Sequence, residues 1–500
     1  MDDTLALVLA STKRFLTDHV DADAIDRNGA FPAGMLARAA DVGLFGLGIP
    51  TEYDGLGLGL FGTSRILCEV ARVDRSLATT LGLHNGLGTR PLIELGSDPL
   101  RSAWLPRFAS GASVASFCAT ESEAGSDLSR VRTTATLVRD QVRLLGSKVF
   151  VTNGGFADAF TALVRSPGMG GERGTSLVFV PRSTHGVRIG AEEHKLGIRG
   201  SSTVSVYFDG ASVPAEHVLG EAGQGIEQAY RALVWGRTLM AAGCLGAAQT
   251  AFEKSVEHVK HRRQFGQALA TRSHVRDRIA EMRALLVGAD ALIARAALET
   301  DGGRDSRIVS AAAKVFASDT ACYVADAALQ LHGGAGYMTE TGVALILRDV
   351  RVARIFEGAN DVLLLRMALE LVMGRDELDR LGIRDAGLRQ CLEESVERAR
   401  RRYGVNLVKR QVYLGRLGQI LTHLQAARAI ELGFGLNESP PDEDTRASCS
   451  RFLEQRASNL LPGLSAADED EVLSMNITHD LLGPERSKNA MGERNGAVMS

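Results

Sequence analysis

The spacing of apolar residues changes twice along the chain, and this change constrains the fold more than any other feature. Up to about residue 115, apolar residues recur at intervals of three and four, as in TLALVLASTKRFL, which predicts helices. Between about 116 and 222, short runs such as TSLVFVP and TVSVYF are separated by turn residues, which predicts a compact, mostly antiparallel β-domain. From residue 223 the helical spacing returns.

Long amphipathic segments follow residue 223 with short breaks between them, and many of their residues are alanine. This arrangement predicts an antiparallel four-helix bundle in which alanine permits close packing. A more charged helical region begins after Gly374, and we expect it to form an extension. The predicted domains are residues 1–115, 116–222, 223–374 and 375–500, because a chain of 500 residues is too long for one ordinary core.

Charge and cysteine content exclude several classes of protein. The formal net charge of −3 gives no reason to expect bulk attraction to nucleic acid or membranes. The six cysteines form no CxxC pair or Cys/His cluster, so neither a disulfide framework nor a metal site is predicted. The N-terminus lacks a basic segment followed by an apolar core, and no run of about 20 apolar residues occurs. We therefore expect a cytoplasmic protein without a signal peptide or a transmembrane helix.

The common nucleotide-binding and hydrolase fingerprints are absent from the sequence. No GxGxxG follows a predicted strand, and neither GxxxxGK[ST] nor a GxSxG elbow occurs. Any nucleotide site must therefore be built from other segments.

Four short segments are candidates for such a site, although each also has an ordinary structural interpretation. In CATESEAGSD (118–127), small residues allow close approach of an anion and Ser126 can hydrogen-bond it, but the segment can equally be a polar connection. KVFVTNGG (148–155) has the Asn-Gly pair of a hairpin, and LQLHGGAG (329–336) has the glycines of a helix end. The arginines of RRQFG (262–266) suit a phosphate or a solvated helix terminus.

A fifth segment, RIFEGAND (354–361), places Glu357 between an aromatic residue and a glycine, just before the apolar run VLLLRMALELVM. Taken alone, Glu357 is interpreted as the acid in the first turn of a helix, stabilised by the helix dipole.

Taken together and in this order, the segments resemble the acyl-CoA dehydrogenase family. The resemblance covers residues from about 5 to about 374 and includes HKLGIRGSSTVSVYFDGASVPAEHVLGEAGQG. The FEGAND form and the helical region after 374 resemble the very-long-chain branch most. The resemblance implies an N-terminal α-helical domain, a β-barrel-like middle domain and a four-helix bundle that enclose FAD, followed by an extra C-terminal helical domain.

The resemblance also implies which residues bind FAD. The segment from Phe117 to Ser126 wraps the flavin, with Thr120 near its ring and Ser126 by the pyrophosphate. A second group reaches the FAD of a neighbouring subunit, so the resemblance implies a homodimer or a higher homo-oligomer. The residues of the first group are Phe117, Ala119, Thr120, Gly125, Ser126, Phe150, Thr152, Ala359 and Asp361. Those of the second group are Arg262, Phe265, Gln330, Gly333 and Gly334.

Glu357 falls on the catalytic base of the family. The implied reaction is removal of the α-proton of an acyl-CoA thioester by Glu357 while hydride passes from the β-carbon to the flavin, giving a trans-2-enoyl thioester. The backbone N–H of Glu357 and a ribityl hydroxyl of FAD hydrogen-bond the thioester carbonyl and stabilise the developing enolate. Burial should raise the pKa of the Glu357 carboxyl. The residues implied to contact the substrate are Ser126, Arg237, Phe356 and Gly358.

Several features depart from the family pattern or leave the substrate open. Ala359 replaces a usual threonine, and LVWGR (233–237) lacks an Asp or Asn that relatives often have, which keeps open a carrier-protein-bound acyl substrate. Gly82 and Gly86 either leave a deep channel for medium-to-long straight acyl chains or serve helix packing. Electron-transfer flavoprotein is the expected acceptor. Membrane association of the extension stays a hypothesis.

Two other functions on the same fold are less well supported. Flavin oxygenases usually replace the glutamate, so Glu357 argues against that class. A DNA-associated relative would need a basic C-terminal region, whereas acids and bases nearly balance there. We therefore expect no nucleic-acid partner.

Overall fold

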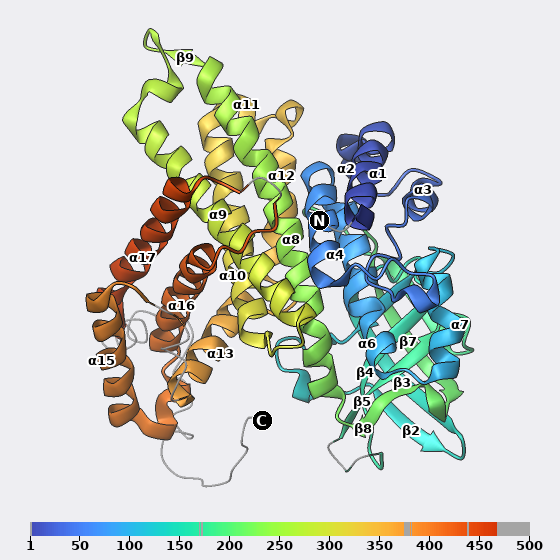
Figure 1. The fold of residues 1–500 in the computed structure, drawn as a ribbon. Coiled ribbons are helices and arrows are strands. Elements are labelled where there is room, and N and C mark those ends of the chain that lie inside the picture. Colours follow the sequence, from blue (N-terminus) through green and yellow to red (C-terminus); the bar gives the residue numbers. More distant parts are fainter. Residues whose placement is uncertain are drawn as a thin grey trace, which may run out of the picture. The chain divides into compact units, whose positions relative to one another are not determined.

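The computed structural model describes residues 3–169, 171, 174–374, 381, 383–437 and 440–467. The chain is divided into two compact units, of which the first comprises Met1–Leu363 with Thr422–Glu454 (Figure 1). The second comprises Leu364–Leu421 with Gln455–Ser500, so the expected domain boundary at residue 374 falls inside this second unit. Residues 476–500 lie outside the described residues.

All of the regular secondary structure described up to residue 109 is helical. Asp21 and Asp74 begin two of these helices, because each carboxylate accepts a hydrogen bond from a backbone N–H three residues later. The helices are α1 (Asp3–His19), α2 (Ala22–Asn28), α3 (Met35–Asp41), α4 (Gly59–Val73), α5 (Arg75–Leu83), α6 (Arg90–Leu95) and α7 (Asp98–Ala109). A π-helical turn, η2 (His84–Gly88), follows α5.

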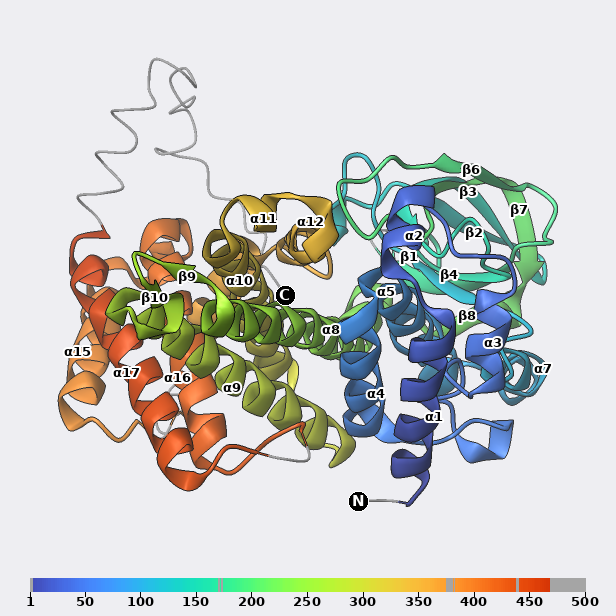
Figure 2. The same ribbon diagram turned by 90° about the horizontal axis from the view of Figure 1, so that it is seen from above.

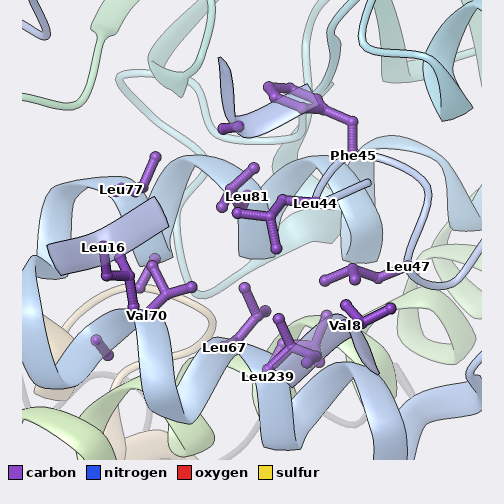
Figure 3. Close-up of a cluster of buried hydrophobic side chains, with 14 of the residues drawn as sticks. Val8, Leu16, Leu44, Phe45, Leu47, Leu67, Val70, Leu77, Leu81 and Leu239 are labelled. Atoms are coloured by element: carbon purple, nitrogen blue, oxygen red, sulfur yellow. The ribbon is translucent and has the colours of Figure 1, made fainter. Parts of the chain in front are cut away.

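A buried apolar cluster holds these helices together. Leu16 of α1, Val70 of α4 and Leu81 of α5 point into it (Figure 3). Leu239 joins the cluster from α8 (Gly225–His261), a helix that begins more than a hundred residues after the others end. The N-terminal helices therefore form one core with the helical region that follows the sheet.

The middle region is an eight-stranded sheet in the order β6-β7-β3-β2-β4-β5-β8, with β1 paired to β4. Most neighbours are antiparallel, as expected, whereas β1 and β2 pair with β4 in parallel. The strands are β1 (Ala115–Cys118), β2 (Thr134–Val138), β3 (Gln141–Thr152), β4 (Ala159–Arg165), β5 (Thr175–Pro181), β6 (Val187–Glu192), β7 (Thr203–Pro214) and β8 (Val218–Gly223).

Three long helices follow the sheet: α8, α9 (Ser273–Asp301) and α10 (Arg307–His332), which run side by side (Figures 1 and 2). A short hairpin of β9 (Arg263–Gln264) and β10 (Gln267–Ala268) joins the first two. Small residues bring α8 close to its neighbours, since a Cβ at Gly246 would overlap the backbone carbonyl of Cys68 in α4. These helices match three of the four predicted bundle segments.

Among the described helices, α10 alone is long and apolar enough to cross a membrane by length and composition. However, 83% of its apolar window is buried inside the protein. A buried core helix of a globular protein passes the same test, so α10 is weak evidence for a membrane span.

The fourth predicted segment is α13 (Asn360–Met373), which is preceded by α11 (Gly334–Tyr337), α12 (Val343–Val350) and the short helix η7 (Arg351–Arg354). Further along the chain are α15 (Ala386–Tyr403), α16 (Gln411–Glu431) and α17 (Glu443–Ser465). Within the second unit, Arg400 donates to the backbone carbonyls of Val372 and Gly374, both at 2.6 Å. Within the first unit, Arg295 of α9 donates to Gln425 of α16 at 2.7 Å.

Candidate active site

The loop that carries Glu357 connects η7 to α13 and is fixed at both ends to α10. Arg354 forms an ion pair with Asp319 of α10 at 2.6 Å, and Asn360 donates to Asp319 at 3.1 Å and to Ser318 at 2.9 Å. Glu357 has a φ of 58°, a conformation that costs free energy in a residue other than glycine. The acid in the first turn of α13 is Asp361, so the interpretation of Glu357 as a first-turn acid is wrong.

The carboxylate of Glu357 lies against α8 and η2. A Cβ placed on Gly236 would come within 2.6 Å of Glu357 Oε2 and within 2.8 Å of Leu87. Glu357 Oε2 is buried and has no hydrogen-bond partner among the described residues. Burial raises the pKa of Glu357 to about 7, while Arg237 and Lys314 partly oppose this rise. A carboxyl with such a pKa, held in an apolar setting, suits a general base near neutral pH.

Arg237 of α8 is close to the backbone of the Glu357 loop. Its Nε donates to the carbonyl of Glu357 at 3.2 Å, and its side chain is buried. Gly358 has a φ of 98°, a conformation that favours glycine, and a Cβ there would be in ordinary contact with the guanidinium at 3.6 Å. The structure therefore brings together three of the predicted site residues, Arg237, Glu357 and Gly358, whereas their contacts with a substrate stay predictions.

The turn η2 joins this site to the sheet. The Ala115 N–H at the start of β1 donates to His84 Nδ1 at 3.1 Å, and His84 Nε2 lies 3.2 Å from the carbonyl of Phe108. Burial lowers the pKa of His84 to about 4, so this imidazole is neutral and structural. On its other side, η2 packs Leu87 against Gly236. The turn thus lies between β1, which leads into the predicted flavin loop, and Glu357.

Gly82 and Gly86 both lie at helix contacts. A Cβ at Gly82 would lie 3.3 Å from Leu67 of α4, and one at Gly86 would lie 3.2 Å from Leu239 of α8. Of the two roles that the sequence left open, the structure supports helix packing for both glycines.

The predicted flavin loop, residues 117–126, is fixed by a buried ion pair. Lys148 of β3 donates to Glu121 at 2.7 Å and to the carbonyl of Ala119 at 3.2 Å. Glu121 also accepts the backbone N–H groups of Arg132 and Thr133, at 2.7 and 3.0 Å. These contacts satisfy both charges in an interior where an isolated charge would be costly.

The outer part of this loop is open. Gly125 and Ser126 are exposed, and a Cβ on Gly125 would meet nothing within 4 Å. Phe117, by contrast, lies in β1 beside Thr161 of β4, and the carbonyl of Thr120 accepts the Val149 N–H at 3.0 Å. The loop therefore has a fixed base and a free rim of small residues that an anionic group can approach.

A register shift in β3 turns Phe150 outward. The shift lies between Lys148 and Val151, and Phe150 has a φ of 55° and is 65% exposed. Lys148, two residues earlier, is fully buried. Bulges of this kind re-aim a side chain next to a functional site. An exposed aromatic ring beside an open loop of small residues fits the stacking surface and the phosphate approach that FAD requires.

Thr152 is the last residue of β3, and Ala359 and Asp361 lie where the Glu357 loop meets α13. The predicted residues of the second cofactor group lie at the far end of the long helices. Arg262 follows α8 roughly 40 Å along the helix axis from Arg237. The rings of His258 and His332 stack with centroids 4.3 Å apart, which places the ends of α8 and α10 together. Phe265, at the tip of the β9–β10 hairpin, is 92% exposed, and Gln330, Gly333 and Gly334 are exposed as well. Within one subunit the two groups of predicted FAD-binding residues are therefore far apart. Contact of the second group with the FAD of a neighbouring subunit stays a prediction.

The sequence analysis did not identify Lys148, Glu121 or Lys314 as part of the site. Lys314 is fully buried in α10 and donates to the Gly358 carbonyl and to Asn360 Oδ1, both at 2.7 Å. The available signal was a single lysine within the otherwise small and apolar run AAAKVFAS. A lysine at such a position is rarely fully buried unless polar groups surround it.

Three family models match the chain. Residues 2–112 match the acyl-CoA dehydrogenase N-terminal domain, residues 116–211 the middle domain, and residues 223–372 the C-terminal domain. The mitochondrial very long-chain specific acyl-CoA dehydrogenase of Mus musculus is 39% identical over 352 residues, which are 68% of this chain. These residues cover 54% of that relative, so the chain spans about half of its length.

Two bacterial proteins match over most of their own length. An acyl-CoA dehydrogenase of Bacillus subtilis is 34% identical over 68% of this chain and 90% of its own. The solved structure of an acyl-CoA dehydrogenase complexed with FAD from Bacillus anthracis superposes with a TM-score of 0.81 at 25% identity. That similarity covers 95% of this chain and 88% of the solved chain. The chain belongs to the acyl-CoA dehydrogenase family.

Proposed function

We propose that the chain catalyses the FAD-dependent α,β-dehydrogenation of an acyl-CoA thioester to a trans-2-enoyl-CoA, a reaction of fatty acid β-oxidation. One observation carries this proposal: Glu357 Oε2 is buried without a hydrogen-bond partner among the described residues, and burial raises the pKa of Glu357 to about 7. A carboxylate without a partner in an apolar site is costly unless a ligand uses it. Removal of the α-proton of a thioester requires such a base.

The residues of this chain perform two tasks in the reaction. Glu357 takes the α-proton, and its raised pKa narrows the gap to the weakly acidic thioester. The fixation of the loop at Arg354, Gly358 and Asn360 holds the Glu357 peptide in place, and its N–H is the group that the resemblance assigns to the thioester carbonyl. Bound FAD supplies the acceptor for the hydride that leaves the β-carbon.

For the substrate, we propose medium-to-long straight-chain acyl-CoA. The similarity to very long-chain specific relatives supports this class. The LVWGR segment raised a carrier-bound acyl group as the alternative, but its side chains serve packing: Val234 and Trp235 are buried, and the Arg90 guanidinium lies 4.2 Å from the centroid of the Trp235 ring. No observation in this segment therefore favours a carrier protein.

Electron-transfer flavoprotein as acceptor, a homodimer or higher homo-oligomer, and a cytoplasmic location complete the proposal. For the assembly of subunits the proposal rests on the resemblance, which assigns Phe265, at the exposed tip of the β9–β10 hairpin, to the FAD of a neighbouring subunit.

The test is an anaerobic titration of the purified flavoprotein with a panel of acyl-CoAs and an acyl carrier protein thioester, followed by the visible flavin spectrum. We expect acyl-CoAs of one chain-length class to bleach the flavin, and Glu357→Gln to abolish bleaching while flavin stays bound. If only the acyl carrier protein thioester bleached the flavin, the substrate would be the carrier-bound acyl group and not an acyl-CoA. Bound flavin that no thioester reduces would overturn it.

A further inference from the structure

Lys314 lies beneath the loop that carries the base. It belongs to α10, its side chain is fully buried, and Nζ donates to the Gly358 carbonyl and to Asn360 Oδ1 at 2.7 Å each. These two acceptors flank the turn immediately after Glu357. A single ammonium group therefore fixes the backbone on the C-terminal side of Glu357, and a change of its position would turn the peptide that joins Gly358 to Ala359.

The charge of Lys314 is not neutralised by a direct partner. Both acceptors are neutral, and no carboxylate among the described residues forms a salt bridge with it. The groups that act on Lys314 electrostatically are Cys244 and Arg237 of α8, Asp319 of α10, and Glu357 itself. Burial lowers the pKa of Lys314 to about 8, and the negative charge of Glu357 favours the ammonium form.

The effect is reciprocal at Glu357. The charged groups that act on this carboxyl are Arg237 of α8 and Lys314 of α10, and both lower its pKa against the larger effect of burial. Arg237 is also within hydrogen-bond distance of the Glu357 carbonyl. Because a buried charge is poorly screened, loss of the Lys314 charge should be felt at Glu357 even without direct contact.

We propose that Lys314 is a positioning residue of the site, which holds the Glu357–Gly358 turn in place and biases Glu357 toward its carboxylate form. Its part in catalysis rests on the proposed dehydrogenation. Its electrostatic action on Glu357 does not, because it depends only on the residues of this chain. Lys314 does not itself contact the reacting atoms.

The direct test is the titration of Glu357 by infrared spectroscopy of flavin-loaded protein labelled with 13C-glutamate. Subtraction of the spectrum of Glu357→Gln isolates the signal of this carboxyl. We expect the midpoint of the titration to move upward by about one unit in Lys314→Met, because an opposite charge near a carboxyl lowers its pKa by about one to three units. Lys314→Arg, which keeps the charge, should leave the midpoint close to that of the unmodified protein.

Lys195→Met is the matched control. Lys195 is less deeply buried than Lys314 but likewise has two acceptors, Thr203 Oγ1 at 3.2 Å and the Ser201 carbonyl, and it belongs to the middle region. Its replacement should leave the Glu357 midpoint unchanged. If Lys314→Met does not fold, Lys314→Gln, which keeps an N–H donor without the charge, replaces it under the same criterion.

A midpoint that does not move in the folded charge-removing variant would overturn the proposal. A midpoint that moves equally in Lys195→Met would overturn it as well, because the effect would then be general destabilisation. These outcomes are independent of catalysis. If no thioester reduces the flavin, the proposed function fails while the titration still decides the role of Lys314. If reduction occurs, its pH midpoint should follow the infrared midpoint in each variant.

Discussion

Two loops of the site are each fixed by a buried lysine, and the two lysines differ in what neutralises them. Beneath the loop 117–126, Lys148 forms an ion pair with Glu121 at 2.7 Å. Beneath the loop 354–361, Lys314 has only neutral acceptors. In the first arrangement the two opposite charges neutralise each other. The second leaves a positive charge that acts on Glu357 and lowers the pKa of its carboxyl. Lys148 thus holds its loop in place, whereas Lys314 holds its loop and also lowers the pKa of Glu357.

The largest effect should follow from removal of the base itself. Glu357→Gln keeps the size of the side chain but cannot accept the α-proton, so we expect the rate of flavin reduction by acyl-CoA to fall by about 10² to 10⁴-fold. Stopped-flow absorbance under anaerobic conditions measures this rate. Flavin content and circular dichroism should stay unchanged. A variant that retains more than about a tenth of the rate would show that another group is the base.

The contrast between the lysines is tested by stability. Lys148→Met leaves the Glu121 carboxylate in the interior without its ion-pair partner, and it should lower the free energy of unfolding by about 3–5 kcal/mol. Lys314→Met leaves only neutral hydrogen-bond acceptors without their donor, so it should lower the free energy of unfolding by about 1–3 kcal/mol. Tryptophan fluorescence during urea unfolding reports on this region, because both tryptophans, Trp104 and Trp235, lie in the first unit.

The double variant Lys148→Met/Glu121→Gln is the control for that comparison. It removes both charges, so it should recover part of the stability that Lys148→Met alone loses. If Lys148→Met and Lys314→Met lowered the free energy of unfolding equally, the distinction between a neutralised ion pair and an unneutralised charge would be contradicted.

A smaller effect is expected from Gly236→Ala, which touches the carboxylate without changing any charge. The added Cβ would come within 2.6 Å of Glu357 Oε2, so the carboxylate must shift. A displacement on the order of 1 Å can cost about 10²-fold in rate. Flavin reduction should therefore slow by up to that factor. Gly415→Ala, where a Cβ would meet nothing within 4 Å, is the control and should leave the rate unchanged. Equal rates for Gly236→Ala and the unmodified protein would show that Glu357 is held more loosely than the structure indicates.

The smallest effect concerns pH. Because burial raises the pKa of Glu357 to about 7, flavin reduction should increase as pH rises through about 7. The folded protein holds this proton more tightly than the unfolded chain, whose carboxyl has its ordinary value of 4.5. The stability contributed by Glu357 is therefore fully present below about 4.5 and is lost as pH rises through about 7. Urea unfolding at several pH values should show this loss in the unmodified protein and not in Glu357→Gln.

Features that depend on near neighbours along the chain could be predicted before the structure was known. The three-and-four spacing predicted the segments that became α8, α9 and α10, and the alternating runs predicted the strands between β1 and β8. Both periods are local properties of a helix or a strand, so they are visible without a partner. The order of short segments also sufficed to identify Glu357 as the candidate base.

The surroundings of Glu357 follow from contacts between distant parts of the chain, which no local pattern reveals. Lys314 and Gly358 are 44 positions apart, and the contact between them has no local period. The same holds for Gly86, which packs against α8, and for Lys148, which is fully buried although a bulge turns Phe150 outward two residues later. Such contacts depend on how distant elements pack, and burial then sets the charges and pKa values that a site uses. A candidate base could therefore be named from the sequence, whereas the groups that set its pKa could not.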